Sequence, residues 1–137
     1  MNIAEATDFA RRNHHAVLAT RRRSGTPQLS PVVIGVDDEG RILISTRQPA
    51  VKVANVGRDP HVSLCITPDG FFGDWVQIDG RAEVVPLDRA MPLLELTYRQ
   101  VQGEHPDWDD FRRAMHDQRR VILCSGKVAY RAMERRC

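Results

Sequence analysis

Short apolar segments separated by turn-forming residues recur along this chain and restrict its fold more than any other feature. We expect strands at residues 17–20, 28–36, 42–46, 62–67, 75–85 and 121–130. Tight-turn sequences such as Asp37-Asp38-Glu39-Gly40 separate most of them. Short strands joined in this way predict a small antiparallel barrel in a mainly β (α+β) chain. Pro31 removes a backbone donor from the second strand, so we expect it at a bulge or an edge.

Helical periodicity interrupts the strands at several points. Apolar spacing indicates a helix at residues 3–13, and a short helix is expected at residues 49–56, ended by Gly57. Asp88 is expected to cap a later helix on which Leu94 and Tyr98 share a face, and Asp107 to cap another. The pattern as a whole is six strands with two or three flanking helices.

Length and composition favour a single domain, residues 1–137, that does not bind nucleic acid. With 42% hydrophobic residues the chain can bury a core. Its 20 basic and 18 acidic residues give a net charge of +2, too balanced for a dedicated nucleic-acid-binding domain. The sequence shows no signal peptide and no apolar run of membrane-spanning length. We therefore expect a cytoplasmic protein without membrane association.

Cysteine and histidine usage predicts neither disulfides nor a metal site. Cys65, Cys124 and Cys137 are too few and too widely spaced for a disulfide framework or a zinc site, and they suit a reducing compartment. The pair His14-His15 and the segment of residues 105–116 contain ligand residue types, but at no known metal-loop spacing. Helix-end and capping roles account for them instead.

Hydroxyl and basic side chains follow the third predicted strand. Ser45, Thr46, Arg47 and Lys52 lie where this strand ends and a short helix begins. Lys52 is one of only two lysines in a chain that otherwise uses arginine. The first backbone N–H groups of a helix have no partner within it, and the helix dipole attracts negative charge there. The turn therefore predicts a phosphate site, with an ordinary solvated turn as the alternative.

Two other segments have both a structural and a functional interpretation. The aromatic residues Phe71, Phe72 and Trp75 either fill the core or form a wall of a flat ring site, since aromatic faces stack on conjugated ligands. The three arginines at residues 21–23 form a solvated hairpin loop or a clamp for an anionic ligand tail. A barrel this small has little interior room, so a cofactor would lie outside it, in a groove shared with a second subunit.

The ordered set of residues 17–20, 25–32, 44–46, 52–64, 75–82 and 103–108 resembles the pyridoxamine-phosphate-oxidase-like split β-barrel family over nearly the whole chain. The stretch Glu104-His105-Pro106-Asp107-Trp108-Asp109-Asp110-Phe111 is particularly similar to an actinobacterial branch that uses coenzyme F-420, the flavin/deazaflavin oxidoreductases of the B class. The arginine-rich, lysine-poor composition also suits an actinobacterial source.

This resemblance implies a six-stranded antiparallel split β-barrel of the FMN-binding type, in a homodimer with two cofactor sites at the subunit interface. It places the cofactor phosphate on Ser45, Thr46, Arg47, Lys52 and Asn55. It places the isoalloxazine-like ring along the second strand, beside Gln28, Ser30 and Val32. Trp75 would close the site from the partner subunit, and the arginines at residues 21–23 would meet the poly-glutamate tail of F-420.

The function that the resemblance implies is an F-420-dependent oxidoreductase. It would transfer hydride from the reduced deazaflavin to a conjugated small molecule such as an enone, a quinone or a bilin. It implies no catalytic side chain, because solvent or a cofactor-bound group can supply the proton. The alternatives are an FMN-binding flavoprotein of the same fold, or a non-catalytic module that binds F-420 or haem.

Overall fold

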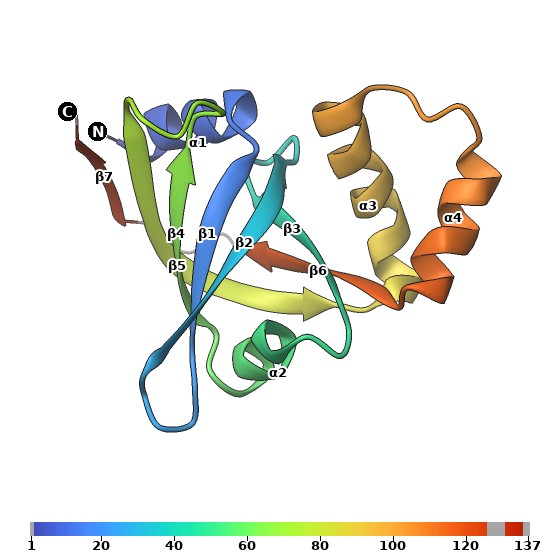
Figure 1. Ribbon diagram of the computed structural model, residues 1–137, viewed down its shortest axis with the longest axis horizontal. Coiled ribbons are helices and arrows are strands. Elements are labelled where there is room, and N and C mark those ends of the chain that lie inside the picture. Colours follow the sequence, from blue (N-terminus) through green and yellow to red (C-terminus); the bar gives the residue numbers. More distant parts are fainter. Residues whose placement is uncertain (1, 126–130, 136–137) are drawn as a thin grey trace.

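Six antiparallel strands form a closed barrel in the computed structural model, which describes residues 2–125 and the backbone of residues 131–135 (Figure 1). The strands are β1 (His15–Arg21), β2 (Pro27–Val36), β3 (Ile42–Arg47), β4 (His61–Thr67), β5 (Trp75–Val85) and β6 (Arg120–Ser125). They follow the order β4-β1-β2-β3-β6-β5, and a further pairing of β4 with β5 closes the ring. The predicted six-stranded antiparallel barrel is confirmed.

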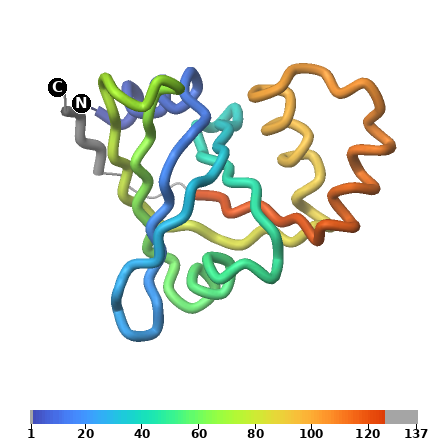
Figure 2. Tube along the Cα trace, in the orientation of Figure 1, coloured from blue at the N-terminus to red at the C-terminus, as the bar shows by residue number. Residues whose placement is uncertain are grey.

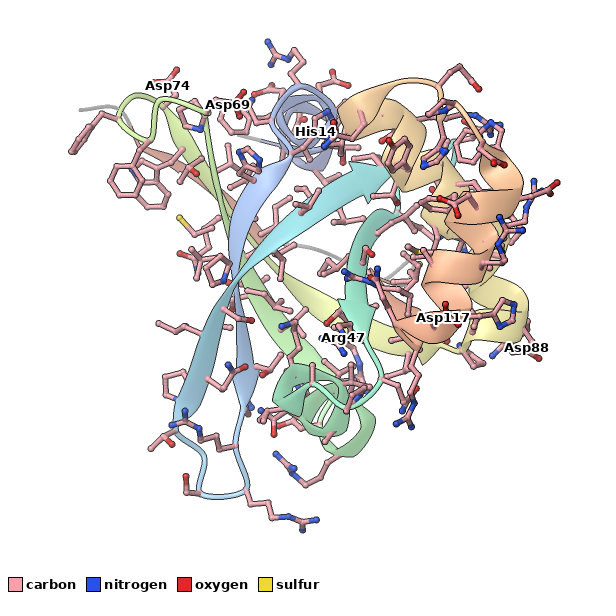
Figure 3. All side chains as sticks on the ribbon, turned by 45° about the vertical axis from the view of Figure 1, so that its right-hand side comes forward. His14, Arg47, Asp69, Asp74, Asp88 and Asp117 are labelled. Carbon is pink, nitrogen blue, oxygen red and sulfur yellow. The ribbon has the colours of Figure 1, made fainter. Side chains whose placement is uncertain are left out.

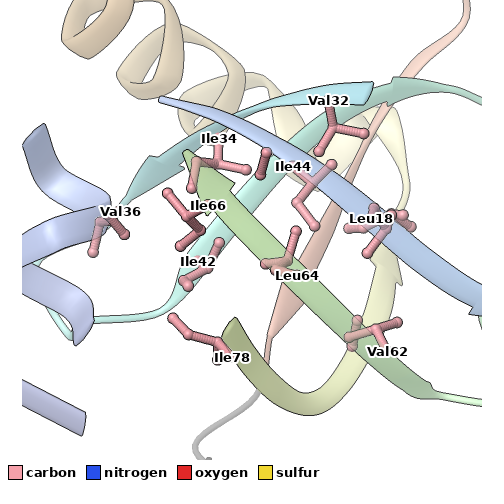
Figure 4. Packing of buried hydrophobic residues seen from close by; sticks show 14 of the residues in the cluster. Leu18, Val32, Ile34, Val36, Ile42, Ile44, Val62, Leu64, Ile66 and Ile78 are labelled. Carbon is pink, nitrogen blue, oxygen red and sulfur yellow. The ribbon is translucent and has the colours of Figure 1, made fainter. Parts of the chain in front are cut away.

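Alternating side chains of these strands fill the barrel interior (Figure 4). In β1 every second residue is buried. Leu18, Ile34, Ile66 and Ile78 come from four different strands and are at most 2% exposed. Successive side chains of a strand point to opposite faces, so the alternation that predicted these strands also places one apolar set inside.

Strands β3 and β6 are buried on both faces, because two helices cover their outer side. These helices, α3 (Leu87–Gln102) and α4 (Trp108–Asp117), lie together on one side of the barrel (Figure 2). Leu43, Ile122 and Cys124 point away from the barrel interior and pack with Leu94 and Phe111 of the helices. This second apolar cluster explains why Ile42–Ile44 of β3 and Val121–Cys124 of β6 are consecutive apolar residues instead of alternating ones.

Two shorter helices complete the packing of the barrel. Ala6 and Ala10 of α1 (Ile3–Arg12) and Val53 and Val56 of α2 (Val51–Arg58) belong to the same buried cluster as the barrel interior. Four helices in the described part of the chain therefore flank the strands, where two or three were expected. Within the described part of the chain, none of the helices combines the length and apolar character needed to cross a membrane.

The predicted helix ends are correct in one case and wrong in two. The Asp107 side chain caps α4 by accepting a backbone hydrogen bond of 3.2 Å, as expected. Asp88 lies in the first turn of α3 and Pro86 occupies the capping position, so Asp88 does not cap this helix. Gly57 lies inside α2, which continues to the residue before Asp59, its C-cap. Asp59 N–H donates to a backbone carbonyl of the last turn (2.8 Å), a bond that does not require glycine.

The last strand was expected at residues 121–130. The structure gives β6 up to Ser125, in agreement with the first part of this prediction, and a further strand, β7 (Arg131–Arg135), pairs with β5. Residues 126–130 of the prediction lie outside the described residues. Two strands use successive parts of the same edge of β5, since Ala82–Val85 pair with β6 and Trp75–Asp79 with β7. Sequence periodicity does not reveal that β5 has two successive partners.

The barrel is split between β2 and β3. These strands pair only where Ile34, Gly35 and Val36 face Ile44, Leu43 and Ile42, and residues 27–33 of β2 have β1 as their one neighbour among the described strands. Ile34 N–H donates to His14 O (2.8 Å), and hydrogen-bonded pairs alternate along an antiparallel ladder. Pro31 is thus opposite Val17 at a non-hydrogen-bonded position, with its nitrogen on the open edge. Its position on an edge is as predicted.

Candidate cofactor site

A cavity of ≈ 690 Å³ lies at this split. It extends from the open edge of β2 and the end of β3 to the start of α2 and the facing sides of α3 and α4. Its lining residues are His15, Ala16, Pro31, Val32, Val33, Ser45, Thr46, Arg47, Ala50, Lys52, Leu94, Thr97, Tyr98, Val101, Gln102, Phe111, Met115 and Arg120. None of these is acidic, and basic and apolar residues occupy different ends.

The basic end consists of Arg47, Lys52 and Arg120. Figure 3 shows Arg47 at the end of β3, close to α2. Among the described residues, no carboxylate forms an ion pair with any of the three. Burial, and to a lesser extent the neighbouring Arg47, lowers the pKa of Arg120. This end of the cavity therefore has positive charge that the described part of the protein does not neutralise.

The start of α2 adds backbone donors to the same end. Its N-cap residue, Ala50, lines the cavity and provides no side-chain cap. The first N–H groups of an uncapped helix are free for an external acceptor, and the dipole favours an anion there. Ser45 and Thr46 add hydroxyl groups from β3, with Thr46 buried. Four residues of the predicted phosphate turn thus line one cavity.

The opposite end of the cavity is largely apolar and comes from α3 and α4. Leu94, Val101, Phe111 and Met115 line it, together with Tyr98. The Tyr98 ring also contacts the rings of three residues around the α3–α4 turn, with centroids 5.0–5.8 Å apart. The helical face containing Leu94 and Tyr98 was recognised in the sequence, but its spacing could not show that it lines a cavity.

Strand β2 provides a polar edge between the two ends. Val33 is opposite His15 at a non-hydrogen-bonded position of the β1–β2 ladder, so its N–H points to the split, while its C=O lies at the last β2–β3 pair. The Pro31 carbonyl also points to the split. Both residues and Val32 line the cavity. A planar ligand in this position would meet backbone donors and acceptors along one edge.

The other predicted site residues lie outside this cavity. Gln28 accepts a hydrogen bond from Thr20 (3.3 Å) and donates one to the Leu29 carbonyl (3.2 Å). The Ser30 hydroxyl is buried and has no hydrogen-bond partner among the described residues. Asn55 is 4% exposed and donates to Thr20 (3.1 Å), which fixes α2 to β1 rather than facing the cavity.

The aromatic segment and the arginine cluster are also separate from the cavity. Phe71 and Phe72 are 67% and 83% exposed, on the loop before Trp75. In the single chain they neither fill the core nor form a wall of this site. Arg21 lines a second cavity of ≈ 650 Å³ and lies 3.7 Å from Asp59.

A family model described as pyridoxamine 5'-phosphate oxidase matches residues 3–125. The chain belongs to this family. The matched region contains the closed barrel, the turn into α2 and both helices that cover β3 and β6.

Solved structures share the fold of this pyridoxamine 5'-phosphate oxidase family member. A conserved hypothetical protein from Mycobacterium tuberculosis has 27% sequence identity and a TM-score of 0.75, over 99% of this chain and 85% of that chain. An F420 reductase is 23% identical, with a TM-score of 0.65 over 90% and 94% of the two chains. A heme binding protein from Mycobacterium smegmatis is 18% identical, with a TM-score of 0.69 over 96% and 57%.

The cavity residues fit a flavin-type group, the kind of cofactor for which this fold is known. Unpaired cations and free helix N–H groups suit a phosphate. The apolar end and the edge of β2 suit a planar heterocycle that needs both apolar contact and hydrogen bonds. Arg120 and Tyr98 were not predicted as site residues. Each is distant in sequence from the phosphate turn and is brought to it only by the fold.

Proposed function

We propose that this protein is a coenzyme F-420-dependent reductase of conjugated small molecules such as enones, quinones or bilins. The observation that carries the proposal is the cavity at the split. At one end it has three cations that no carboxylate of the described residues neutralises, and at the other an apolar wall. A cofactor with a planar ring and an anionic side chain matches this cavity, because its ring suits the apolar end and its anionic group suits the basic end. The similarity to an F420 reductase supports the choice of cofactor.

The chain's own residues would bind and orient this cofactor. Arg47 and Lys52, with the hydroxyls of Ser45 and Thr46 and the first N–H groups of α2, would hold its phosphate. The open edge of β2 would hydrogen-bond the ring, while α3 and α4 exclude water from its face. The bound deazaflavin supplies the hydride, and the protein supplies position and a dry environment.

A homodimer is part of the proposal. Val17, Leu29 and Val33 lie on the outer face of the β1–β2 pair and are 38%, 62% and 38% exposed. Large exposed apolar side chains that form one patch are typical of an interaction surface. Pairing of two copies through this face would bury the patch, and Trp75 would then close the cavity of the partner subunit.

An FMN-binding flavoprotein is the second candidate. A phosphate monoester carries close to two negative charges at neutral pH, and the three cations at the phosphate end suit such a group. The same cavity would then hold an isoalloxazine ring, and the chemistry would be that of an oxidase or an electron carrier.

Titration of the apo-protein with oxidised F-420 and, separately, with FMN tests both candidates, with ligand fluorescence as the signal. Tight binding of F-420 with weak binding of FMN supports the reductase, and mixing with reduced F-420 and an enone or quinone should then consume the deazaflavin. Preference for FMN supports the second candidate. Binding of neither refutes the proposed function.

A further inference from the structure

Three polar residues of α3 line the largely apolar end of the cavity: Thr97, Tyr98 and Gln102. The Thr97 hydroxyl already has a partner, because it donates to the Leu93 carbonyl (2.8 Å). The Gln102 side chain is exposed. Tyr98 is partly buried, and its hydroxyl has no hydrogen-bond partner in the part of the chain that the structure describes. Tyr98 therefore offers the one donor of these three that is both sheltered and available.

Three rings around the α3–α4 turn hold the Tyr98 side chain. Phe111 and Trp108 meet its ring edge to face, with centroids 5.2 Å and 5.8 Å away, and His105 packs against it at 5.0 Å. Trp108 is itself held, since its ring N–H donates to the Glu104 carboxylate (3.2 Å). A buried tyrosine usually pairs its hydroxyl. A ring held on three sides with an unpaired hydroxyl is therefore suited to an acceptor on a ligand.

We propose that the Tyr98 hydroxyl is a catalytic hydrogen-bond donor to the carbonyl oxygen of the conjugated substrate, an inference that rests on the proposed function and names the substrate group which the site recognises. The open edge of β2 would hold the cofactor ring. A substrate at the apolar end of the cavity then lies between that ring and α3, with its carbonyl oxygen at Tyr98.

This oxygen is the atom on which charge develops. Hydride addition to the β-carbon of an enone moves the electron pair of the C=C bond towards the carbonyl, and the substrate becomes an enolate with its negative charge on oxygen. A fixed donor at that oxygen stabilises the charge as it forms, most strongly where water is excluded. The enolate then takes a proton from water at its α-carbon. Tyr98 keeps its own proton, and the reduced deazaflavin of the proposed function is the sole reductant.

A purely structural role for Tyr98 makes a different prediction. Tyr98→Leu removes the ring contacts and should lower the Tm under either role. Tyr98→Phe keeps the ring and removes one oxygen atom that has no partner among the described residues, so its Tm should stay within about 2 °C of wild type. If Tyr98 only packs α3 against α4, Tyr98→Phe should also bind and turn over every ligand as wild type does.

The first test uses the apo-protein and does not depend on the cofactor. The probe is 4-nitrophenolate at pH 9, which resembles the enolate because it is planar and carries its charge on one oxygen. Nitrobenzene, which lacks that oxygen, is the control ligand, and calorimetry measures both. Tyr98→Phe should weaken 4-nitrophenolate binding by about 10- to 100-fold and nitrobenzene binding by less than about twofold. Equal binding of 4-nitrophenolate by both proteins, or no binding by wild type, overturns the role of Tyr98.

The second test uses turnover with reduced F-420 and two acceptors. Menadione is a quinone and has carbonyl oxygens, whereas methylene blue accepts hydride without one. Tyr98→Phe should lower kcat for menadione by about 100-fold and leave methylene blue within about twofold of wild type. Equal loss with both acceptors, or no loss with menadione, contradicts donation to a carbonyl oxygen. If wild type reduces neither acceptor, the proposed function fails, and the apo-protein titration still decides whether the Tyr98 hydroxyl binds an anionic oxygen.

Discussion

Replacement of Gln100 by alanine should lower the free energy of unfolding by about 2–3 kcal/mol. The Gln100 side chain replaces a neighbouring strand at the end of β2. It accepts a hydrogen bond from Val36 N–H (2.9 Å) and donates one to Val36 C=O (2.6 Å). Two such bonds contribute about 1–3 kcal/mol in total, and partly buried backbone groups left without partners add to the loss. The Tm should fall by roughly 6–9 °C, since a loss of 1 kcal/mol lowers the Tm of a domain of this size by about 3 °C.

The matched control is Gln102→Ala, two residues further along α3. Gln102 is exposed and has no hydrogen-bond partner among the described residues, so its replacement should change the free energy of unfolding by less than about 0.5 kcal/mol. Urea unfolding followed by circular dichroism measures both variants. Equal stabilities of Gln100→Ala and Gln102→Ala would show that α3 is not held to β2 through this contact.

Four further outcomes are expected. Lys52→Ala should weaken binding of the phosphate-bearing ligand by about 1.5–3 kcal/mol, measured by titration, without changing the Tm of the apo-protein. Gly35→Ala should destabilise by about 1–3 kcal/mol in urea unfolding, because its Cβ would lie 3.1 Å from Thr97 Oγ1 and 3.3 Å from Thr97 Cα. Leu29→Glu should convert a dimer to a monomer in analytical ultracentrifugation, because it places charge on the exposed apolar face. Hydrogen bonds from His61 lower the pKa of Asp59 below its ordinary value of 3.8. The stability that this carboxylate contributes is therefore present above about pH 4 and lost as the pH falls through the lower folded pKa, and Asp59→Asn should flatten that acid dependence in unfolding experiments.

The barrel could be predicted from the sequence because its determinants are local. Period-two burial, tight turns and the edge preference of Pro31 each depend on a few neighbouring residues. The positions whose secondary structure was predicted wrongly are those where tertiary contacts determine where an element begins or ends. Gly57 indicates a helix end by composition, yet α2 continues past it because Asn55 and Val56 are buried against the barrel. The strand β7 exists because β5 offers a second stretch of edge, which no local pattern records.

The candidate site shows the same difference between local and tertiary determinants. A strand end and a helix start place Ser45, Thr46, Arg47 and Lys52 together, so their shared position in one cavity follows from local sequence, while their binding of a phosphate stays a prediction. Asn55 does not line the cavity, because its side chain donates to Thr20 instead, a contact that spacing along the chain could not show. The predictions for Gln28, Ser30 and Trp75 depend on a second subunit or on the ligand itself, and they stay predictions.

Arg120 lines the cavity but was not predicted as a site residue. It is next to Arg119 in a chain rich in arginine, so nothing in its neighbourhood distinguishes it from a solvated surface residue. Only the β3–β6 register brings it opposite Arg47, where its side chain is half-buried. Like charges directly opposite each other in a sheet are unfavourable. The proximity of these two cations follows from strand pairing between distant parts of the sequence, and spacing along the chain could not reveal it.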